Sequence, residues 1–285
     1  MKRRVWTIAA AVLIVLFAVW IAHGNENVGL TVYETEVSGL PKAFDGLRIV
    51  QLSDLHNVVF KDDNAKLFSL VEQAEPDMIF ITGDMLDSRR TDIEAALKVA
   101  EKAVSLAPVY YVTGNHEARI GEYRTFEQDL EELGATVLRN RAVQLEKEGD
   151  VITIAGVDDP SFMASYLDAD AGEAVMKAAL EQLDDEGCTL LLSHRPELFD
   201  VYADKGITLT FSGHTHGGQI RLPILGGLYA PGLGFLPEYD GGLYRQDDSA
   251  MIVSRGIGNS LFPFRVNNDP EVVLAILNCE QKKGT

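Results

Sequence analysis

The sequence contains little cysteine. It has two cysteines, Cys188 and Cys279, and neither has another cysteine or a histidine beside it at the spacing of a metal site. Each cysteine lies in an apolar run, which indicates buried and unreactive thiols. One disulfide between them is the alternative outside the cytoplasm. A metal site built on cysteine is therefore not expected.

Positive charge is also scarce. There are 25 Lys and Arg against 43 Asp and Glu, so the formal net charge is -18. Taking the three bases Lys2, Arg3 and Arg4 away from that -18 leaves -21 for the remainder of the chain. A surface this acidic repels nucleic acids and anionic lipid headgroups. A role in processing nucleic acid is therefore not expected, although a metal site can still bind a phosphate locally.

Long apolar runs are missing from most of the chain, with one exception at its start. The run from Val5 to Ala22 contains no charge, and its 18 residues are just enough to span a bilayer as a helix. The three bases before it stay in the cytoplasm, so the chain after the run is exported. We expect residues 1–25 to be an uncleaved membrane anchor. A cleaved signal peptide is the alternative, with a twin-arginine signal at Arg3-Arg4 as a minor one.

Linkers, repeats and low-complexity tracts are absent from the rest, so we expect residues 26–285 to form one domain. Short apolar runs alternate there with segments of helical periodicity, which predicts an α/β fold whose strands are covered on both faces. The expected strands include 47–52, 78–81, 109–112, 151–155, 189–192 and 208–211. After Gly218 strands follow one another without helices, which predicts a second, more antiparallel sheet packed on the first.

Potential metal ligands follow these strands at the point where each strand ends. In open α/β sheets, ligands bind beyond the carboxyl ends of the strands, so side chains from separate strands can meet there. Five of the six histidines fall at such ends, and the sixth, His23, flanks the apolar run. The side chains concerned are Asp54, His56, Asp84, Asn115, His116, His194, His214 and His216.

The stretch 212–219 carries two of these histidines, one residue apart, on a turn bounded by glycines. In an extended segment residues i and i+2 point the same way, so we expect His214 and His216 to face one site. Neutral imidazole is a common ligand for transition metals. The strand ends together supply more ligands than one four- to six-coordinate ion can use. This predicts two ions that share a bridging carboxylate.

The spaced motifs resemble those of the calcineurin-like metallophosphoesterases, and in particular a bacterial membrane-anchored branch of that family. The motifs are Asp54-x-His56, Gly83-Asp84-x-x-Asp87, Gly114-Asn115-His116-Glu117, His194 and Gly213-His214-x-His216. The segments 217–219 and 254–259 extend the resemblance over nearly all of the exported part. The resemblance implies two packed mixed β-sheets flanked by helices, which is a four-layer sandwich.

The resemblance also implies a role for each residue. One ion would be bound by Asp54, His56 and His216, the other by Asn115, His194 and His214, and Asp84 would bridge the two. His116 would be the general acid for the leaving oxygen, or would stabilise charge in the transition state. Asp87 would accept a hydrogen bond from His116 and so fix its tautomer.

The activity implied by the resemblance is the hydrolysis of phosphate mono- or diesters by a hydroxide that bridges the two ions. Two divalent cations and two carboxylates leave a net positive site, which suits a phosphate. The ions would be manganese, zinc or iron. Together with the anchor, this predicts a single-pass protein of the cell membrane whose catalytic domain lies outside the cytoplasm and acts on a phosphate ester, with a lipid-linked one among the candidates.

Two alternative functions are considered. A pyrophosphatase acting on a nucleotide-linked lipid, of the UDP-diacylglucosamine type, would require the domain to lie in the cytoplasm. A non-catalytic metal-binding scaffold for protein partners would keep the fold without turnover.

Two interpretations concern residues outside the motifs. The glycine-rich loop 223–239 carries several leucines and aromatics, which we interpret as packing over the second sheet or as an apolar wall that faces the membrane. Arg255 and Arg265 are expected in surface salt bridges, with contact to a substrate phosphate as the alternative.

Overall fold

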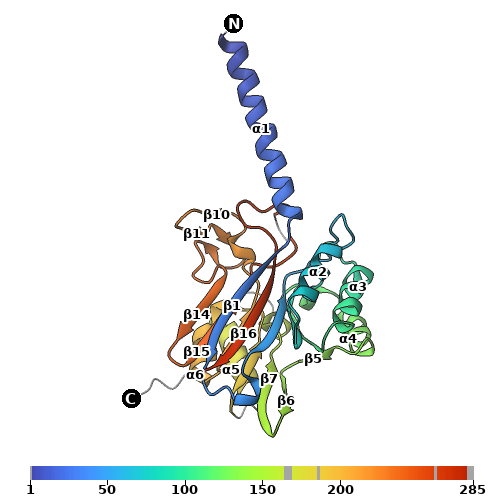
Figure 1. Cartoon of the computed structure of the whole chain (residues 1–285), viewed down its shortest axis with the longest axis vertical. Helices are drawn as coiled ribbons and strands as arrows, with labels where there is room; N and C mark the ends of the chain where they lie inside the picture. Colours follow the sequence, from blue (N-terminus) through green and yellow to red (C-terminus); the bar gives the residue numbers. More distant parts are fainter. Residues whose placement is uncertain (1, 164–168, 185–186, 260–261, 281–285) are drawn as a thin grey trace.

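The computed structural model describes residues 2–163, 169–184, 187–259 and 262–280. Helix α1 (Lys2–Glu26) projects from one end of the domain (Figure 1). Within the described part of the chain it is the one helix long and apolar enough to cross a membrane, judged by length and composition. None of its apolar window is buried against the rest of the protein.

Two mixed sheets of six strands each form the framework. The first has the order β1-β16-β2-β3-β4-β5, and its neighbours are parallel except for β16 and β2. Its strands are β1 (Gly29–Val37), β16 (Glu271–Cys279), β2 (Leu47–Leu52), β3 (Met78–Thr82), β4 (Val109–Val112) and β5 (Thr136–Val137).

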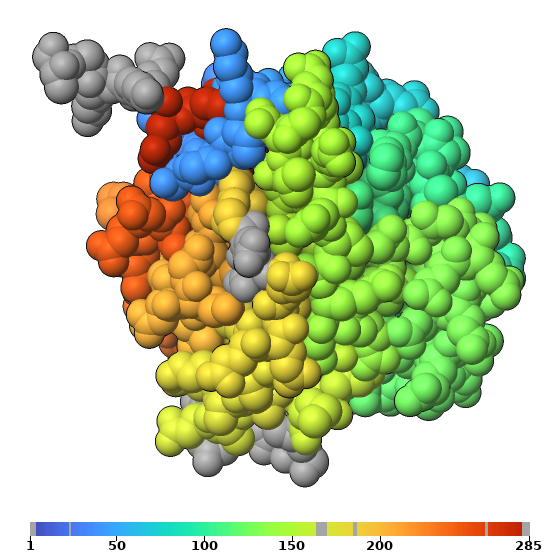
Figure 2. Space-filling model, turned by 90° about the horizontal axis from the view of Figure 1, so that it is seen from below, coloured from blue at the N-terminus to red at the C-terminus, as the bar shows by residue number. Residues whose placement is uncertain are grey.

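The second sheet has the order β14-β15-β9-β8-β7-β6, with antiparallel pairs at its two edges and parallel pairs between them. Its strands are β14 (Gly242–Gln246), β15 (Ser249–Val253), β9 (Leu209–Ser212), β8 (Thr189–Leu192), β7 (Asp150–Gly156) and β6 (Arg141–Lys147). In Figure 2, seen from the end opposite α1, the yellow-green β6–β7 segment runs between green and orange parts of the chain.

The two sheets pack face to face, with helices on both outer sides. Between them, the rings of Phe80 on β3 and Phe211 on β9 meet edge to face with centroids 5.0 Å apart. The helices α2 (Ala65–Gln73), α3 (Ile93–Val104) and α4 (Tyr123–Glu132) cover the first sheet, and α5 (Ala169–Glu181) and α6 (Phe199–Lys205) cover the second. The expected four-layer sandwich is confirmed.

The strands are divided between the sheets differently from the expectation. Those after Gly218 do not form a sheet of their own, because β15 lies parallel beside β9 and β16 returns to the first sheet between β1 and β2. The division falls between β5 and β6 instead. Hydrophobic periodicity reports how a strand is buried, and it does not report which strand lies next to it. The prediction of a separate, more antiparallel sheet was therefore wrong.

Smaller features complete the fold. Two short hairpins lie in and just before the glycine-rich loop, namely β10 (Arg221–Leu222) with β11 (Gly226–Gly227) and β12 (Tyr229–Ala230) with β13 (Gly234–Phe235). Figure 1 shows β10 and β11 near the base of α1. Both cysteines are free, so the structure has no disulfide between them.

Candidate metal centre

The predicted ligands meet where strands of both sheets end. Asp84 follows β3 of the first sheet and His194 follows β8 of the second, and Asp84 Oδ2 lies 3.3 Å from His194 Nε2. His56, after β2, and His216, after β9, approach with their Nε2 atoms 3.1 Å apart. The carboxyl ends of strands from two sheets thus enclose one polar centre.

The ligand atoms fall into groups whose members all lie within 4.8 Å of one another. The groups are Asp54, His56 and His216; Asp84, His194 and His214; and His56, Asp84 and His116. Asp84 belongs to two groups, and its Oδ2 also lies 3.7 Å from His56 Nε2. The first group holds the three residues that the resemblance implies for one ion. The second holds Asp84 with His194 and His214, two of the three residues implied for the other ion, while Asn115 belongs to no group.

The turn that carries the two neighbouring histidines is not extended. His214 has φ +71° and His216 has φ +49°, while Thr215 between them has φ -82°. The alternation of an extended strand was therefore the wrong reason for placing both imidazoles in the centre. The left-handed residues instead direct His214 towards Asp84 and direct His216 towards Asp54.

Left-handed backbone recurs at the other predicted ligands. Asp54, His56 and Asp84 have φ values of +52°, +46° and +52°. This conformation costs about 1–3 kcal/mol for a residue other than glycine and persists only where its surroundings enforce it. Here the backbone N–H of His56 donates to Asp84 O at 3.0 Å, and that of Asp54 donates to Gly83 O at 3.1 Å. Such strain is typical of functional sites.

Close approach of the backbone around Asp84 and Asp54 requires glycine. A Cβ atom on Gly114 would collide with the Asp84 carboxylate, and one on Gly213 would collide with Ser53 and with Asp54. The absence of these two side chains therefore leaves room for the carboxylates at the centre.

Among the predicted ligands, three buried side-chain atoms have no hydrogen-bond partner in the part of the chain that the structure describes. They are Asn115 Oδ1, His56 Nδ1 and His194 Nε2. His194 Nδ1 lies 2.8 Å from Thr82 O, which places a proton on Nδ1, so the neutral ring would direct the lone pair of Nε2 into the centre, towards Asp84. A buried acceptor without a donor is costly, and a cation would satisfy Asn115 Oδ1 and, in the neutral form of His194, its Nε2. The imidazole, carboxylate and amide donors suit manganese, iron or zinc, so these residues fit divalent ions.

The protonation states of three histidines are those that metal ligands need. Burial lowers the pKa of His56 and that of His214 well below the usual value, and it lowers the pKa of His216 to about 4. These three imidazoles are therefore neutral at pH 7, as ligands must be.

The carboxylate of Asp84 and the ring of His194 form a charged pair in the protein itself. Burial favours the neutral form of Asp84, but the charges of His194 and His116 outweigh it and hold its pKa well below the usual value. Burial likewise opposes the charged form of His194, but the Asp84 charge raises its pKa to about 10. An ion bound at Nε2 of His194 would displace this proton.

His116 is held by the loop that follows Asp84. The backbone N–H of Ser88 donates to His116 Nδ1 at 3.0 Å, whereas Asp87 Oδ1 lies 3.6 Å from that nitrogen. Asp87 accepts hydrogen bonds from Arg89 N at 2.9 Å and Arg90 Nη2 at 3.0 Å. In this geometry Ser88 contacts the ring directly, and Asp87 shapes the loop that presents Ser88.

Glu117 is a buried residue to which the sequence pattern assigned no role. Its Oε2 accepts hydrogen bonds from Asp84 N at 2.9 Å and Gly114 N at 2.8 Å, and its Oε1 accepts one from Leu86 N at 3.0 Å. Burial and the charge of Asp84 raise the pKa of Glu117 to about 8, against the effect of the backbone donors. Glu117 thus joins the loops after β3 and β4. The one signal in the sequence was its position directly after His116.

Replacing Glu117 with glutamine tests this link between the loops. The NH2 group of the glutamine is a donor and would face a backbone N–H where the native protein has an accepting carboxylate oxygen. This should cost about 1–3 kcal/mol of unfolding free energy. For a chain of this size we expect the melting temperature to fall by about 2–10 °C. Thermal unfolding measured by circular dichroism at pH 9, above the pKa of Glu117, checks this, with Glu131→Gln on the exposed face of α4 as the control. Equal melting temperatures for the two variants would show that Glu117 does not hold the loops together.

Two arginines, Arg195 and Arg265, lie beside histidines of the centre. The sequence pattern gave no role to Arg195, and it predicted a surface salt bridge for Arg265. Arg195 Nη1 is 3.0 Å from His214 Nε2, and the same guanidinium pairs with Asp159. Arg265 is 2% exposed, so it is not part of a surface salt bridge. Its Nη2 lies 3.3 Å from His216 Nδ1, and burial lowers its pKa to about 10.

Arg255 forms the predicted salt bridge, but not at the surface. Its guanidinium pairs with the carboxylate of Glu271, which is buried, while Arg255 itself is partly buried. Arg265 differs because its Nη1 bonds to the carbonyl oxygen of Arg255 and its Nη2 to that of Gly258. Arg265 therefore supports the turn around the centre from within the protein.

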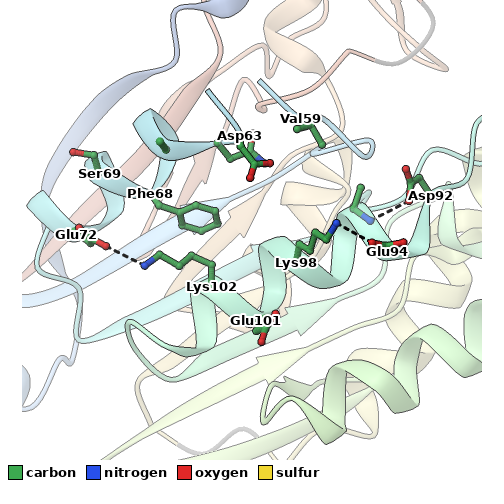
Figure 3. Close-up of a pocket in the computed structure, with 13 residues that line it drawn as sticks. Val59, Asp63, Phe68, Ser69, Glu72, Asp92, Glu94, Lys98, Glu101 and Lys102 are labelled. Carbon is green, nitrogen blue, oxygen red and sulfur yellow. Dashed lines mark hydrogen bonds and ion pairs between the residues drawn. The ribbon is translucent and has the colours of Figure 1, made fainter. Parts of the chain in front are cut away.

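A hollow of about 710 Å³ lies away from this centre, between α2 and α3 (Figure 3). Its basic side chains are paired, with Lys102 Nζ 3.3 Å from Glu72 Oε1 and Lys98 Nζ 2.8 Å from Glu94 Oε1. The lining contains no histidine among the described residues. This hollow therefore offers neither the ligands nor the unsatisfied atoms of the metal centre.

Comparisons with known proteins agree with this geometry. Residues 47–218 match the family model described as calcineurin-like phosphoesterase. The metallophosphoesterase YkuE of Bacillus subtilis is 30% identical over 254 residues, which cover 87% of this chain and 84% of that protein. The phosphodiesterase YaeI of Escherichia coli is 28% identical over 232 residues and 80% of each chain. The transmembrane protein with metallophosphoesterase domain of Danio rerio is 28% identical over 95% of this chain and 62% of that protein.

Proposed function

Because this chain belongs to the calcineurin-like phosphoesterase family and is a metal-dependent phosphoric ester hydrolase, we propose that it hydrolyses phosphate mono- or diesters with two divalent ions at Asp84. The observation that carries this proposal is the position of the Asp84 carboxylate between two groups of buried ligands. Two divalent ions held there would supply a water of lowered pKa and a positive clamp for the phosphate oxygens. Manganese, zinc and iron are the candidates, because they accept mixed imidazole and carboxylate ligands.

The ligand assignment follows the two groups and adds Asn115, which the resemblance implies and which belongs to neither group. We assign Asp54, His56 and His216 to one ion, Asn115, His194 and His214 to the other, and Asp84 to both. The unsatisfied Asn115 Oδ1 supports this assignment, because an amide oxygen in that position has no other use in the described structure.

His116 is proposed as the acid that protonates the leaving oxygen. Its Nδ1 accepts from the Ser88 N–H, so the neutral ring carries its proton on Nε2. The ring lies against that of His56, with centroids 4.5 Å apart, which keeps it beside the ligands. From there Nε2 can donate to the leaving oxygen or stabilise its charge. Asp87 would act on His116 through the loop that it shapes.

Tethering to a membrane is part of the proposal. Helix α1 projects from the domain, and one relative is described as a transmembrane protein. The basic residues Lys2, Arg3 and Arg4 precede the apolar run and favour a cytoplasmic N-terminus. The catalytic domain would then lie outside the cytoplasm on a single-pass anchor. The pyrophosphatase alternative needs the catalytic domain to lie in the cytoplasm, which is the opposite orientation. The alternative of a non-catalytic scaffold is not favoured, because the chain belongs to a family of enzymes.

A lipid-linked phosphate ester is the substrate that the glycine-rich loop favours. A pocket of about 200 Å³ is lined there mainly by apolar side chains, and it begins at Gly218, two residues after His216. A Cβ on Gly232, in the turn between β12 and β13, would lie 3.9 Å from His214 Nε2. The loop therefore reaches from the centre to the surface, where an acyl group could be held while its phosphate reaches the ligands.

A substrate panel tests the proposed function. The full-length chain in detergent is stripped of metal, loaded with manganese, zinc or iron, and assayed with soluble mono- and diesters and with phosphatidic acid. We expect turnover of at least one phosphate ester that is lost on chelation and restored by metal. A chain that binds two ions and turns over none of these esters would contradict the proposal.

A further inference from the structure

Large apolar side chains that are exposed on the domain gather in two segments, with others scattered singly at Val32, Val59, Val151 and Met163. The gathered ones are Ile224, Leu225, Phe235, Leu236, Phe262 and Phe264, which we call the apolar rim. Ile224 is fully exposed and Phe235 is 76% exposed. Single exposed apolar residues are ordinary, but a contiguous patch marks a contact surface.

The two segments form one surface rather than two. The ring of Tyr229 lies 5.4 Å from that of Phe235 and 6.1 Å from that of Phe262, measured between centroids. The pocket of about 200 Å³ lies between the segments and is lined by both of them. Gln219 also lines this pocket, and its Nε2 donates to Phe262 O at 3.1 Å, which holds the second segment beside the pocket.

This surface lies at the base of α1. The side chain of Asn25 accepts a hydrogen bond from Arg265 N at 2.8 Å and donates one to Arg265 O at 3.0 Å, and Arg265 directly follows Phe264. The apolar run of α1 ends at Ala22, which a rise of 1.5 Å per residue places only about 4.5 Å from Asn25 along the helix. If α1 spans a bilayer, Phe264 therefore lies at the boundary between hydrocarbon and headgroups.

We propose that the apolar rim contacts the bilayer from which α1 emerges, so that the domain is in contact with the membrane surface and is not attached through α1 alone. The partner is the neutral lipid surface itself. The domain is strongly acidic, so charge does not attract it to anionic headgroups, and apolar burial supplies the contact. The inference rests on the tethering part of the proposed function and is independent of the reaction.

The contact would also fix how the metal centre faces the membrane. The hairpin of β12 and β13 carries Phe235 of the rim, and its turn at Gly232 approaches His214. A rim held in the interface would therefore hold this hairpin, and the pocket beside it, on the membrane side of the centre.

Spin labels on the full-length chain test the contact. With Cys188→Ala and Cys279→Ala as background, a single cysteine replaces Leu225 or Leu236, both of which are exposed and contribute nothing to the core. The control is Val151→Cys on β7, the strand that Figures 1 and 2 place at the end away from α1. Each labelled protein is reconstituted in phosphatidylcholine vesicles. Accessibility is measured to oxygen, which enters lipid, and to a nickel complex, which stays in water.

We expect labels on the rim to be highly accessible to oxygen. Their accessibility to the nickel complex should be about tenfold lower than that of the control label, as for side chains about 5–10 Å below the headgroups. The difference should persist in high salt, because the contact is apolar. Equal nickel contact at rim and control would overturn the proposal. Protection from both reagents would overturn it as well, since protein would then cover the rim. Neither metal nor turnover enters these readings, so failure of the reaction and failure of the contact are distinguishable.

Discussion

Replacing Asp84 with asparagine is expected to abolish turnover and to release at least one metal ion while the fold persists. The substitution keeps the size of the side chain and removes the negative charge that lies between the two ligand groups. His116 N donates to Asp84 Oδ1 at 2.8 Å, a bond that the asparagine oxygen can still accept. Loss of a shared anionic ligand removes several kcal/mol of charge stabilisation, so we expect kcat to fall by about 10³-fold or more.

Metal content per chain, steady-state turnover and thermal unfolding measure the three parts of this result. The matched control is Asp92→Asn, because asparagine can replace the aspartate that caps α3, where the Asp92 carboxylate accepts from Ala95 N at 3.0 Å. That control should keep both ions and its activity. Retained activity in Asp84→Asn with two ions bound would remove the basis for a bridging carboxylate.

Replacing His116 with glutamine is expected to lower kcat by about 10²–10⁴-fold with both ions retained. The loss should depend on the leaving group. An alkoxide needs a proton as it departs, whereas a nitrophenolate does not, so an acid at His116 predicts a larger loss for alkyl esters. We would measure kcat for both kinds of ester and the metal content of each variant.

The control for this variant is Ser88→Ala, which removes a hydroxyl 3.2 Å from His116 Nδ1 and keeps the backbone N–H that bonds to the same atom. It should change kcat little. Equal losses for the two leaving groups would argue for stabilisation of charge instead of proton transfer. Release of an ion from His116→Gln would make His116 a ligand, in keeping with its place in the third group with His56 and Asp84.

The strands and the candidate ligands were accessible to the sequence because they depend on local pattern. A buried strand such as Leu47–Leu52 is a continuous apolar run, and the polar residue after it stands out. Asp84, His194 and His216 each follow such a run, and the order of the motifs resembled one family. The pairing of strands was not accessible, because β16 and β15 are similar apolar runs that join different sheets.

The residue that caps α3 is a second feature that the local sequence pattern could not decide. Thr91 and Glu94 form the pattern of a capping box, yet the cap is Asp92, and Thr91 Oγ1 donates to Asp87 O at 3.1 Å instead. Two adjacent residues could each cap the helix, and the loop that presents Ser88 to His116 decides between them. Local chemistry permitted both, and a contact within the loop selected one.

The sequence by itself determined the fold class, the family, and the residues offered as ligands, because apolar periodicity and motif spacing are properties of neighbouring positions in the chain. Tertiary structure alone decided how those residues are used. The left-handed turns at Asp54, His56 and Asp84, the bonds from Asp84 N and Leu86 N to Glu117, and the buried Arg265 beside His216 all depend on segments that are distant in sequence. Their conformations are set by packing and hydrogen bonds between loops that follow different strands, and no local pattern encodes such contacts.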